Sequence, residues 1–282
     1  MHTHVAMQAL ANIAVAAPVL KKLMEKYPDD FVYGAVSPDI IVGKKYAGIM
    51  HHCHNWDMGW LILSESKSDA QKASAYGYLV HLAADIVAHN YYIPFKIVRS
   101  YKARVLSHTY WEMRFDLGLP EQVWKHLDKI SELDCTEFDQ VLNLVLKKTI
   151  FSFKTNKRIF SSILALQKMR GLRESLKLYE KQSRYEIELE NRQHYLDLVM
   201  ESVLAFIADP DHAWCLEIDP TGLSRLTYAD NLRRRMKALL SKQILSQAAA
   251  DRLVELVRER LVVGLYRPNL VLPDITDVLF GV

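Results

Sequence analysis

Hydrophobic residues recur at intervals of three and four along most of the chain, which is the spacing of one face of an α-helix. The strict alternation that marks half-buried strands is scarce, so the sequence predicts an all-α protein. Its expected architecture is a multi-helix globular bundle. Helices are predicted over 3–26, 68–93, 98–117, 120–132, 136–150, 156–207 with a break near Gly171, 229–241 and 246–264.

Glycine and proline interrupt this periodicity in three places. Segment 34–56 contains several of them, segment 209–228 contains two Asp-Pro dipeptides, and the tail begins at Pro268. These three segments are expected to be irregular. The chain shows no internal repeat and no low-complexity tract.

The apolar N-terminal segment ALANIAVAAPVL (9–20) is interrupted by Asn12 and Pro18 and has no preceding basic region. It is too short to span a bilayer, and its pattern continues into KKLMEKY as an amphipathic helix would. No other segment reaches transmembrane length. The sequence therefore predicts neither a signal peptide nor a transmembrane helix.

Charge and cysteine content narrow the function classes further. The 36 basic and 33 acidic residues give a net charge of only +3, which supports neither non-specific nucleic-acid binding nor attraction to an anionic membrane. No specific nucleic-acid binding is predicted either. The three cysteines are odd in number and far apart, so they imply no disulfide framework. A reducing cytoplasmic location is expected.

The distribution of histidines is uneven. Three of the eleven are scattered through the C-terminal part, and the other eight lie within the first 119 residues, at positions 2, 4, 51, 52, 54, 81, 89 and 108. Within the predicted helix 68–93, His81, Asp85 and His89 are spaced four apart, so their side chains form one stripe. Burying two imidazoles and a carboxylate in such an apolar stripe is costly unless something binds them.

Further candidate ligands lie near this stripe in sequence. His2 and His4 open the chain, Asp39 follows Pro38 in a loop, and HHCHNWD (51–57) supplies three histidines. His108 and Glu112 are four residues apart on the next predicted helix, so both side chains can coordinate one ion. Taken singly, each has an ordinary explanation, such as a satisfied core histidine or an exposed helix pair.

Taken together, these residues favour a polynuclear metal site between helices of the N-terminal part. Nitrogen and oxygen ligands without organised cysteines suit zinc, and also manganese, iron or nickel. Other helical metal folds fit less well, because the Glu-x-x-His of di-iron bundles is missing from these positions, as are the His-Asp dipeptide of helical phosphohydrolases and the HExxH of zinc proteases.

The order His, PD, His-x-W-D, H-x-x-x-D…H and H-x-x-x-E resembles the zinc-dependent phospholipase C family, whose superfamily includes single-strand-specific zinc nucleases. The resemblance covers about residues 1–116. It implies an all-α fold that holds two or three zinc ions and hydrolyses phosphate esters. Residues 1–119 are expected to form this metal-binding core, with 120–282 as an additional helical region of unknown function packed on it.

Carried over position by position, the resemblance assigns individual roles. Asp39 is implied to be both a ligand and the catalytic base. Asp85 is expected to bridge two ions. The implied zinc ligands are His4, Asp39, His54, His81, Asp85, His89, His108 and Glu112, with His2, His52 and Met1 as further candidates.

Three departures from the family pattern bear on specificity. Secreted relatives use the amino group and carbonyl of an N-terminal Trp as ligands, whereas here Met1 or His2 would have to substitute. The gap between Asp85 and His89 is four residues instead of the six common in the family, so His89 is expected to project from the helix itself. The family's choline pocket does not carry over.

The predicted function is a metal-dependent phosphoric ester hydrolase, phospholipase C-like, in which a zinc-activated hydroxide attacks phosphorus in line. Its substrate is expected to be a phosphate ester, with phospholipid as one candidate. Two alternatives stay open: a single-strand nuclease or nucleotidase of the same superfamily, and a non-enzymatic protein with a structural metal site. A coordination position left open to water distinguishes a catalytic site from a structural one.

Overall fold

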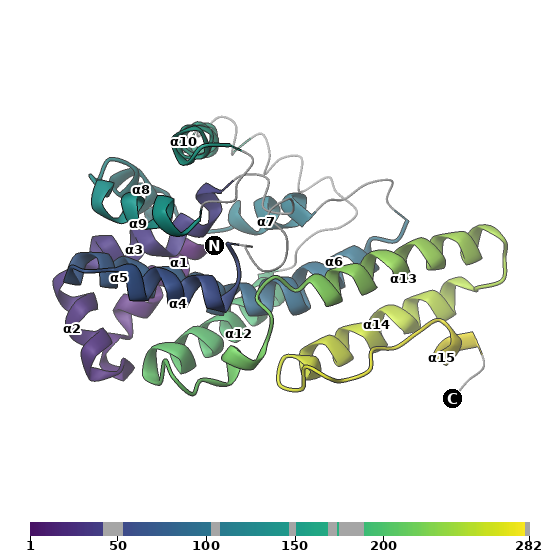
Figure 1. Ribbon diagram of the computed structural model, residues 1–282. Coiled ribbons are helices and arrows are strands. Elements are labelled where there is room, and N and C mark those ends of the chain that lie inside the picture. The colour runs from purple at the N-terminus through teal and green to yellow at the C-terminus, as the bar shows by residue number, and fades with distance from the viewer. Residues whose placement is uncertain (42–52, 103–107, 147–150, 169–173, 175–188, 280–282) are drawn as a thin grey trace.

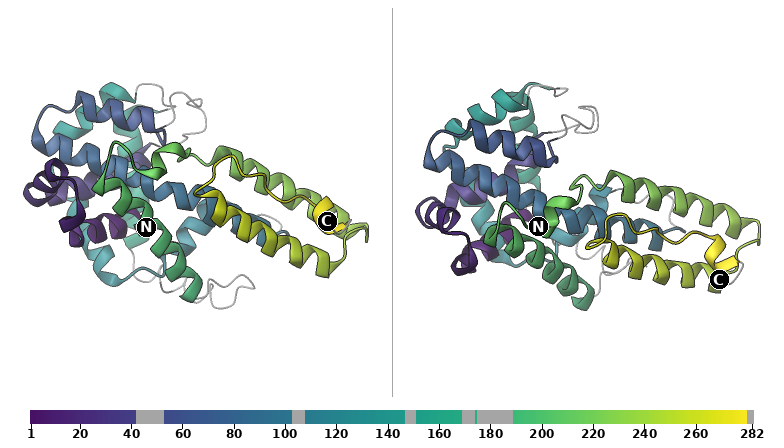
Figure 2. Two further views of the ribbon diagram at one scale, coloured as in Figure 1. Left: turned by 90° about the horizontal axis from the view of Figure 1, so that it is seen from below. Right: turned by 60° about the horizontal axis from the view of Figure 1, so that its bottom comes forward.

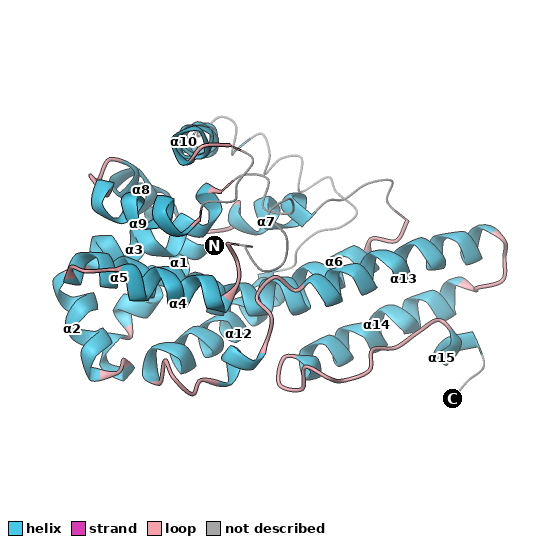
Figure 3. Ribbon diagram, in the orientation of Figure 1, coloured by secondary structure: helices cyan, strands magenta, loops and turns pink. Residues whose placement is uncertain are grey.

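The computed structural model describes residues 1–41, 53–102, 108–146, 151–168, 174 and 189–279 (Figure 1). Within these ranges every regular element is a helix and none is a strand (Figure 3). The all-α prediction is therefore confirmed. None of the described helices is both long and apolar enough to cross a membrane.

The structure describes the following helices. In chain order they are α1 (His2–Ala11), α2 (Pro18–Lys26), α3 (Pro28–Val36), α4 (Trp56–Glu65), α5 (Asp69–Val87), α6 (Ile93–Arg99), α7 (His108–Asp116), α8 (Glu121–Ser131), α9 (Thr136–Val145), α10 (Phe153–Lys168), α12 (Leu189–Ala208), α13 (Leu223–Ser241), α14 (Gln247–Gly264) and α15 (Thr276–Leu279). Within the described residues, 3-10 turns occupy Ile13–Val15, Ser37–Ile40 and Trp214–Glu217, and a π-helix, Ala88–Tyr92, joins α5 to α6.

Several boundaries differ from those that periodicity predicts. The predicted helix 3–26 is two helices, because Pro18 begins α2 as a new first turn. The long helix expected over 156–207 is described as α10 and α12, and its predicted break at Gly171 lies outside the described residues. The region 34–56, expected to be irregular, contains the end of α3 and the start of α4.

Helix α3 was not predicted from hydrophobic periodicity for an identifiable reason. The second half of α3, from Phe31 to Val36, is buried on every side, so it has no polar face to give a helical pattern. Local signals for α3 and α4 are nevertheless present. Pro28 and two acidic residues begin α3, and the side chain of Asn55 caps α4 by accepting from the backbone N–H of Asp57.

Helix α5 is the centre of the fold, with α3, α4 and α12 packed around it (Figure 2). It begins with a capping box in which Ser68 and Gln71 satisfy each other's backbone N–H groups. Its residues from Gly77 to Val87 are all buried. The candidate site residues His81 and Asp85 therefore lie on the buried C-terminal half of this helix.

The C-terminal part packs against this centre and then extends away from it. On α12, the buried Ser202 hydroxyl donates to the Ala83 carbonyl of α5 at 2.7 Å. Beyond it, α13 and α14 form an antiparallel hairpin that projects from the other helices, with α6 packed against both (Figures 1 and 2). One hydrophobic core runs continuously from α1 to α14.

Two glycines allow α3 and α5 to approach at backbone distance. A Cβ added at Gly34 would lie 1.8 Å from the Ser74 carbonyl oxygen, and one at Gly77 would lie 2.0 Å from that of Phe31. Since backbone cannot move aside cheaply, only glycine fits at either position. This crossing places the carbonyl of Ala35 beside His81.

Gly77→Ala is accordingly expected to lower the free energy of unfolding by about 3 kcal/mol, at the upper end of the cost of overpacking a core. Denaturant unfolding followed by circular dichroism measures it. Gly264→Ala is the control, because a Cβ there would meet only the Arg225 guanidinium, at 3.3 Å or more. Equal stability of the two variants would contradict the close crossing.

Candidate metal centre

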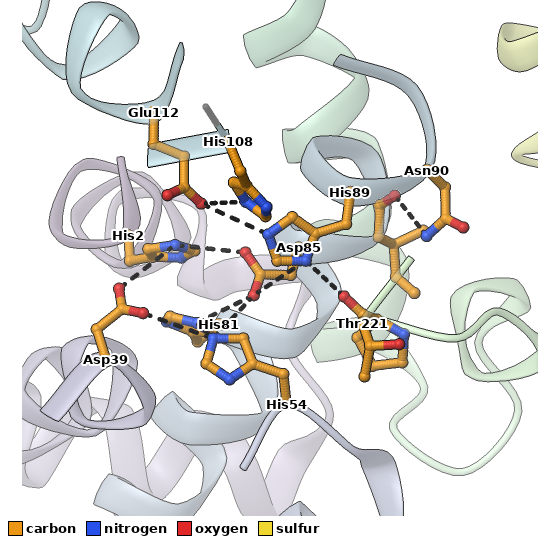
Figure 4. Close-up of polar contacts among 12 residues, drawn as sticks. His2, Asp39, His54, His81, Asp85, His89, Asn90, His108, Glu112 and Thr221 are labelled. Carbon is orange, nitrogen blue, oxygen red and sulfur yellow. Dashed lines mark hydrogen bonds and ion pairs between the residues drawn. The ribbon is translucent and has the colours of Figure 1, made fainter. Parts of the chain in front are cut away.

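Helix α5 and the π-helix after it carry the buried floor of the site (Figure 4). His81 and Asp85 are each 1% exposed, and His89, on the π-helix, is 6% exposed. Because a π-helix inserts an extra residue into a turn, it changes the direction of the side chains that follow. His89 nevertheless still faces Asp85, with Nδ1 3.8 Å from Asp85 Oδ2, although it projects from the π-helix and not from α5.

The first group of potential ligands joins α1 to α5. His2 Nε2 lies 3.4 Å from Asp85 Oδ1, and the ring of His2 stacks on that of His81 with centroids 3.6 Å apart. His2, His81 and Asp85 present ligand atoms close enough together to share one ion.

The second group adds Asp39, which lies in the 3-10 turn Ser37–Ile40 and not in the predicted loop, and His54, which lies in the turn before α4. His54 Nε2 lies 3.0 Å from His81 Nε2 and 3.5 Å from Asp39 Oδ1. Asp85 Oδ2 is 3.2 Å from His81 Nε2 and 3.3 Å from His54 Nε2. One oxygen of Asp85 thus faces His2 and the other faces His54 and His81, so the carboxylate could contact two ions.

The third group lies on the other side of Asp85. His108 Nε2 on α7 is 2.9 Å from Glu112 Oε1, one helical turn later. His89 Nε2 approaches the same oxygen at 3.5 Å. His89, His108 and Glu112 therefore converge on a separate position (Figure 4).

Backbone carbonyls fix the orientation of two of these rings. His81 Nδ1 donates to the Ala35 carbonyl at 2.8 Å, and His89 Nδ1 donates to the Pro220 carbonyl at 2.7 Å. A carbonyl can only accept, so the Nδ1 atoms carry the protons. In the neutral rings, each Nε2 then carries a lone pair that is directed into the cluster. This Nδ1-protonated tautomer can bind a metal ion through Nε2.

The donor set fits divalent cations. Asp85 Oδ2 and His89 Nε2 are buried, and neither has a hydrogen-bond partner within the part of the chain that the structure describes. Leaving such atoms unsatisfied is costly, and a cation would satisfy both. Imidazole nitrogens mixed with carboxylate oxygens are ligands that zinc accepts.

The charges within the cluster are strongly coupled. Burial alone would raise the pKa of Asp85, but the imidazoles of His89, His81 and His2 outweigh burial and hold it well below its usual value. Burial would also lower the pKa of His89, but Asp85 and Glu112 raise it to about 9. Burial and the neighbouring His81 lower the pKa of His2 to about 3. The metal-free site therefore holds an ionised Asp85 beside a protonated His89.

Exposure differs sharply between the carboxylates. The side chain of Asp85 is 2% exposed, whereas those of Asp39 and Glu112 are 39% and 42% exposed. Asp85 therefore lies at the floor of the cluster and the other two lie at its mouth. The cluster is thus more exposed at Asp39 and Glu112 than at Asp85.

The structure places the candidates on the first helix differently from the prediction. His2 joins the cluster, while His4 belongs to none of the ligand groups formed by the described residues. The reason is geometric, since two positions along an α-helix turn a side chain by about 200°. His4 is half-buried, and burial lowers its pKa. His52 lies outside the described residues.

Met1 contributes a different contact from the predicted one. Its amino group donates to the carboxylate of Asp116 on α7. Sequence reasoning missed Asp116, although its position four residues after Glu112 was a usable signal. It also missed Cys53, whose thiol lies 3.2 Å from His54 Nδ1.

An all-helical fold whose His, Asp and Glu side chains form groups that could hold a metal ion defines a class of helical proteins able to bind metal. The sequence profile of the family described as zinc dependent phospholipase C matches residues 1–157, more than half of the chain. The protein belongs to this family, which implies metal-dependent phosphoesterase activity. No curated protein and no solved structure gives a significant match to the chain.

Proposed function

We propose that this protein is a phospholipase C-like hydrolase of phosphate esters that uses two or three zinc ions. The observation that carries the proposal is the buried carboxylate of Asp85, whose two oxygens face two different groups of imidazole nitrogens at 3.2 to 3.4 Å. Such a carboxylate, flanked by histidines of fixed tautomer, supports a site built around adjacent cations. Family membership supplies the reaction class.

Zinc bound at these ligands would lower the pKa of a water molecule towards neutrality and polarise the phosphoryl oxygens. The protein's own residues hold and orient the reactants. His81 and His54 are the buried ligands of the second group. Asp39 is the partly exposed one, with Oδ1 3.5 Å from His54 Nε2. From that position Asp39 can accept a proton from the attacking water.

In the proposed reaction the water oxygen forms a bond to phosphorus as the ester P–O bond breaks, and the departing oxygen takes up a proton. Glu112 lies at the opposite part of the mouth, beside His108 and His89. Burial would raise the pKa of Glu112, but its interactions with these two histidines lower it, so it remains an anion that can bind a cation. The substrate phosphate is expected to enter between Asp39 and Glu112.

Asp39→Asn tests the role of the proposed base. The amide keeps the shape but cannot accept the proton, so kcat is expected to fall by about 10²- to 10⁴-fold, the usual contribution of a general base. The zinc content should change by less than one ion per chain. Steady-state kinetics and metal analysis by mass spectrometry measure both, with the exposed Asp69→Asn as control. Unchanged kcat would refute the assignment.

A substrate panel on the zinc-loaded protein tests the function as a whole. It compares phospholipid vesicles, a small phosphodiester, nucleotides and single-stranded DNA. Turnover of phospholipid is the expected outcome. Preference for DNA or nucleotides would assign the protein to the nuclease branch of the superfamily, and bound zinc with no turnover of any ester would indicate a structural metal site.

A further inference from the structure

Three consecutive backbone carbonyls of one turn accept hydrogen bonds from side chains around the candidate metal centre. Trp56 Nε1 donates to the Ile218 carbonyl at 2.9 Å. Asn90 Nδ2 donates to the next carbonyl, of Asp219, at 2.9 Å, and His89 Nδ1 donates to the third, of Pro220, at 2.7 Å. The turn therefore holds the π-helix on one side and the start of α4 on the other.

The turn's own sequence sets its shape. Asp219 accepts from the backbone N–H of Thr221 at 2.9 Å and from its hydroxyl at 2.5 Å. The Gly222 N–H donates back to the Asp219 carbonyl at 3.1 Å. Aspartate followed by proline is a common turn former, and these bonds hold the three accepting carbonyls in place before they meet the π-helix.

Gly222 allows the turn to touch the backbone of His89. Its φ of +57° is in the left-handed region, and an added Cβ would lie 2.3 Å from the His89 carbonyl oxygen and 2.5 Å from its Cβ. Any other residue would push the turn away from the π-helix. The distance between the Pro220 carbonyl and His89 Nδ1 therefore depends on glycine at this position.

We propose that the turn Ile218–Gly222 is a positioning element for the third ligand group. It fixes the tautomer and direction of the His89 ring, so that Nε2 points at Glu112 and His108. The turn lies outside the matched residues 1–157, so the C-terminal part of this chain completes a site that the N-terminal part begins. This inference rests on the proposed metal centre.

The effect is expected to be confined to one ion. His81 takes its orientation from the Ala35 carbonyl on α3 and not from the turn. The group of His2, His81 and Asp85 lies on α1 and α5, whereas His89 is the member of the third group whose Nδ1 is held by Pro220. Loss of the turn contact should therefore weaken the third group and leave the ion of the His2, His81 and Asp85 group bound.

Gly222→Ala is the first test, with Gly264→Ala as the matched control because a Cβ there meets no backbone. Gly222→Ala is expected to bind one ion fewer per chain, or to bind the third ion about 10- to 100-fold more weakly, as when an orienting contact to a metal ligand is lost. Metal content after dialysis against a weak chelator and the visible absorption of the cobalt(II)-substituted protein are the readouts. Full metal content with an unchanged cobalt spectrum would overturn the proposal.

A second variant decides the matter if Gly222→Ala does not fold. Asp219→Ala removes both carboxylate acceptors from an exposed position and leaves the accepting carbonyls in the chain. Asp211→Ala, exposed in the same loop region, is its control. Selective weakening of the third ion in Asp219→Ala supports the proposal, and binding equal to that of Asp211→Ala overturns it.

His89→Ala separates failure of this inference from failure of the proposed function. If His89→Ala loses one ion and the turn variants do not, His89 is a ligand and only the positioning role is refuted. If the wild-type protein and His89→Ala bind the same number of ions, the third group itself is refuted.

Discussion

Asp85→Asn is expected to remove at least one zinc ion from the protein and to reduce phosphodiester turnover by roughly 10³-fold or more, comparable to the loss of a major electrostatic contact to the transition state. The change keeps the side-chain volume but removes the charge that faces His2 on one side and His54 and His81 on the other. One amide cannot offer two anionic oxygens to two cations. Metal analysis and kinetics on a small phosphodiester measure the two effects.

The matched control is Asp69→Asn, because Asp69 lies in the exposed first turn of the same helix. Its metal content and turnover should equal those of the unmodified protein. Full zinc content in Asp85→Asn would show that the carboxylate does not bridge ions, and the dinuclear arrangement would have to be abandoned.

His81→Ala separates a bridging role for Asp85 from a general need for charge. His81 belongs both to the group with His2 and Asp85 and to the group with Asp39 and His54, so its removal should also lower zinc content and turnover. Unlike Asp85→Asn, it leaves the carboxylate intact. Unchanged metal content in both variants would refute the site as a whole.

The sequence predicted that His81 and Asp85 lie together because both residues belong to one helix. Regular spacing on α5 is enough to put His81 and Asp85 on one face, and burial of polar residues in an apolar stripe signals a ligand. The same reasoning could not choose between His2 and His4. That choice depends on the direction in which α1 meets α5, which is a property of packing between helices and not of either segment alone.

The parts of the site that sequence reasoning missed are backbone atoms and local irregularities. The carbonyls of Ala35 and Pro220 carry no side-chain signature, and the π-helix at His89 looks like an ordinary helical continuation in the sequence. Gly34 and Gly77 can be read from the sequence, but the sequence does not show that they allow two helices to cross at backbone distance. Sequence patterns therefore identified most of the candidate ligands, whereas the groups that orient them required the structure.

Zinc is expected to stabilise the protein strongly, and more strongly as the pH rises from about 6.5 to about 9. A ligand present at a thousand times its dissociation constant adds about 4 kcal/mol per site. In a protein of this size, that raises Tm by roughly 10 °C. Because the pKa of His89 is raised to about 9 in the metal-free site, zinc must displace a proton from its ring over most of this range.

The sign of the pH effect follows from that displacement. A pKa raised by folding stabilises the metal-free protein fully below the unfolded value near 6.5, and this stabilisation is lost as the pH rises through about 9. The zinc-bound protein has no such proton to lose. The pKa values of Asp85 and Glu112 are lowered and that of His2 falls to about 3, so these groups do not titrate in this window.

The contribution of zinc to the free energy of unfolding should therefore increase by up to about 1.4 kcal/mol per pH unit for one displaced proton. The difference in Tm between zinc-bound and chelated protein should widen accordingly. Differential scanning calorimetry at pH 6.5, 7.5 and 8.5, with either zinc or EDTA present, measures it. In His89→Ala the widening should disappear, since the titrating ligand is gone. A difference that stays constant or narrows with rising pH in the unmodified protein would show that His89 does not exchange its proton for a metal ion.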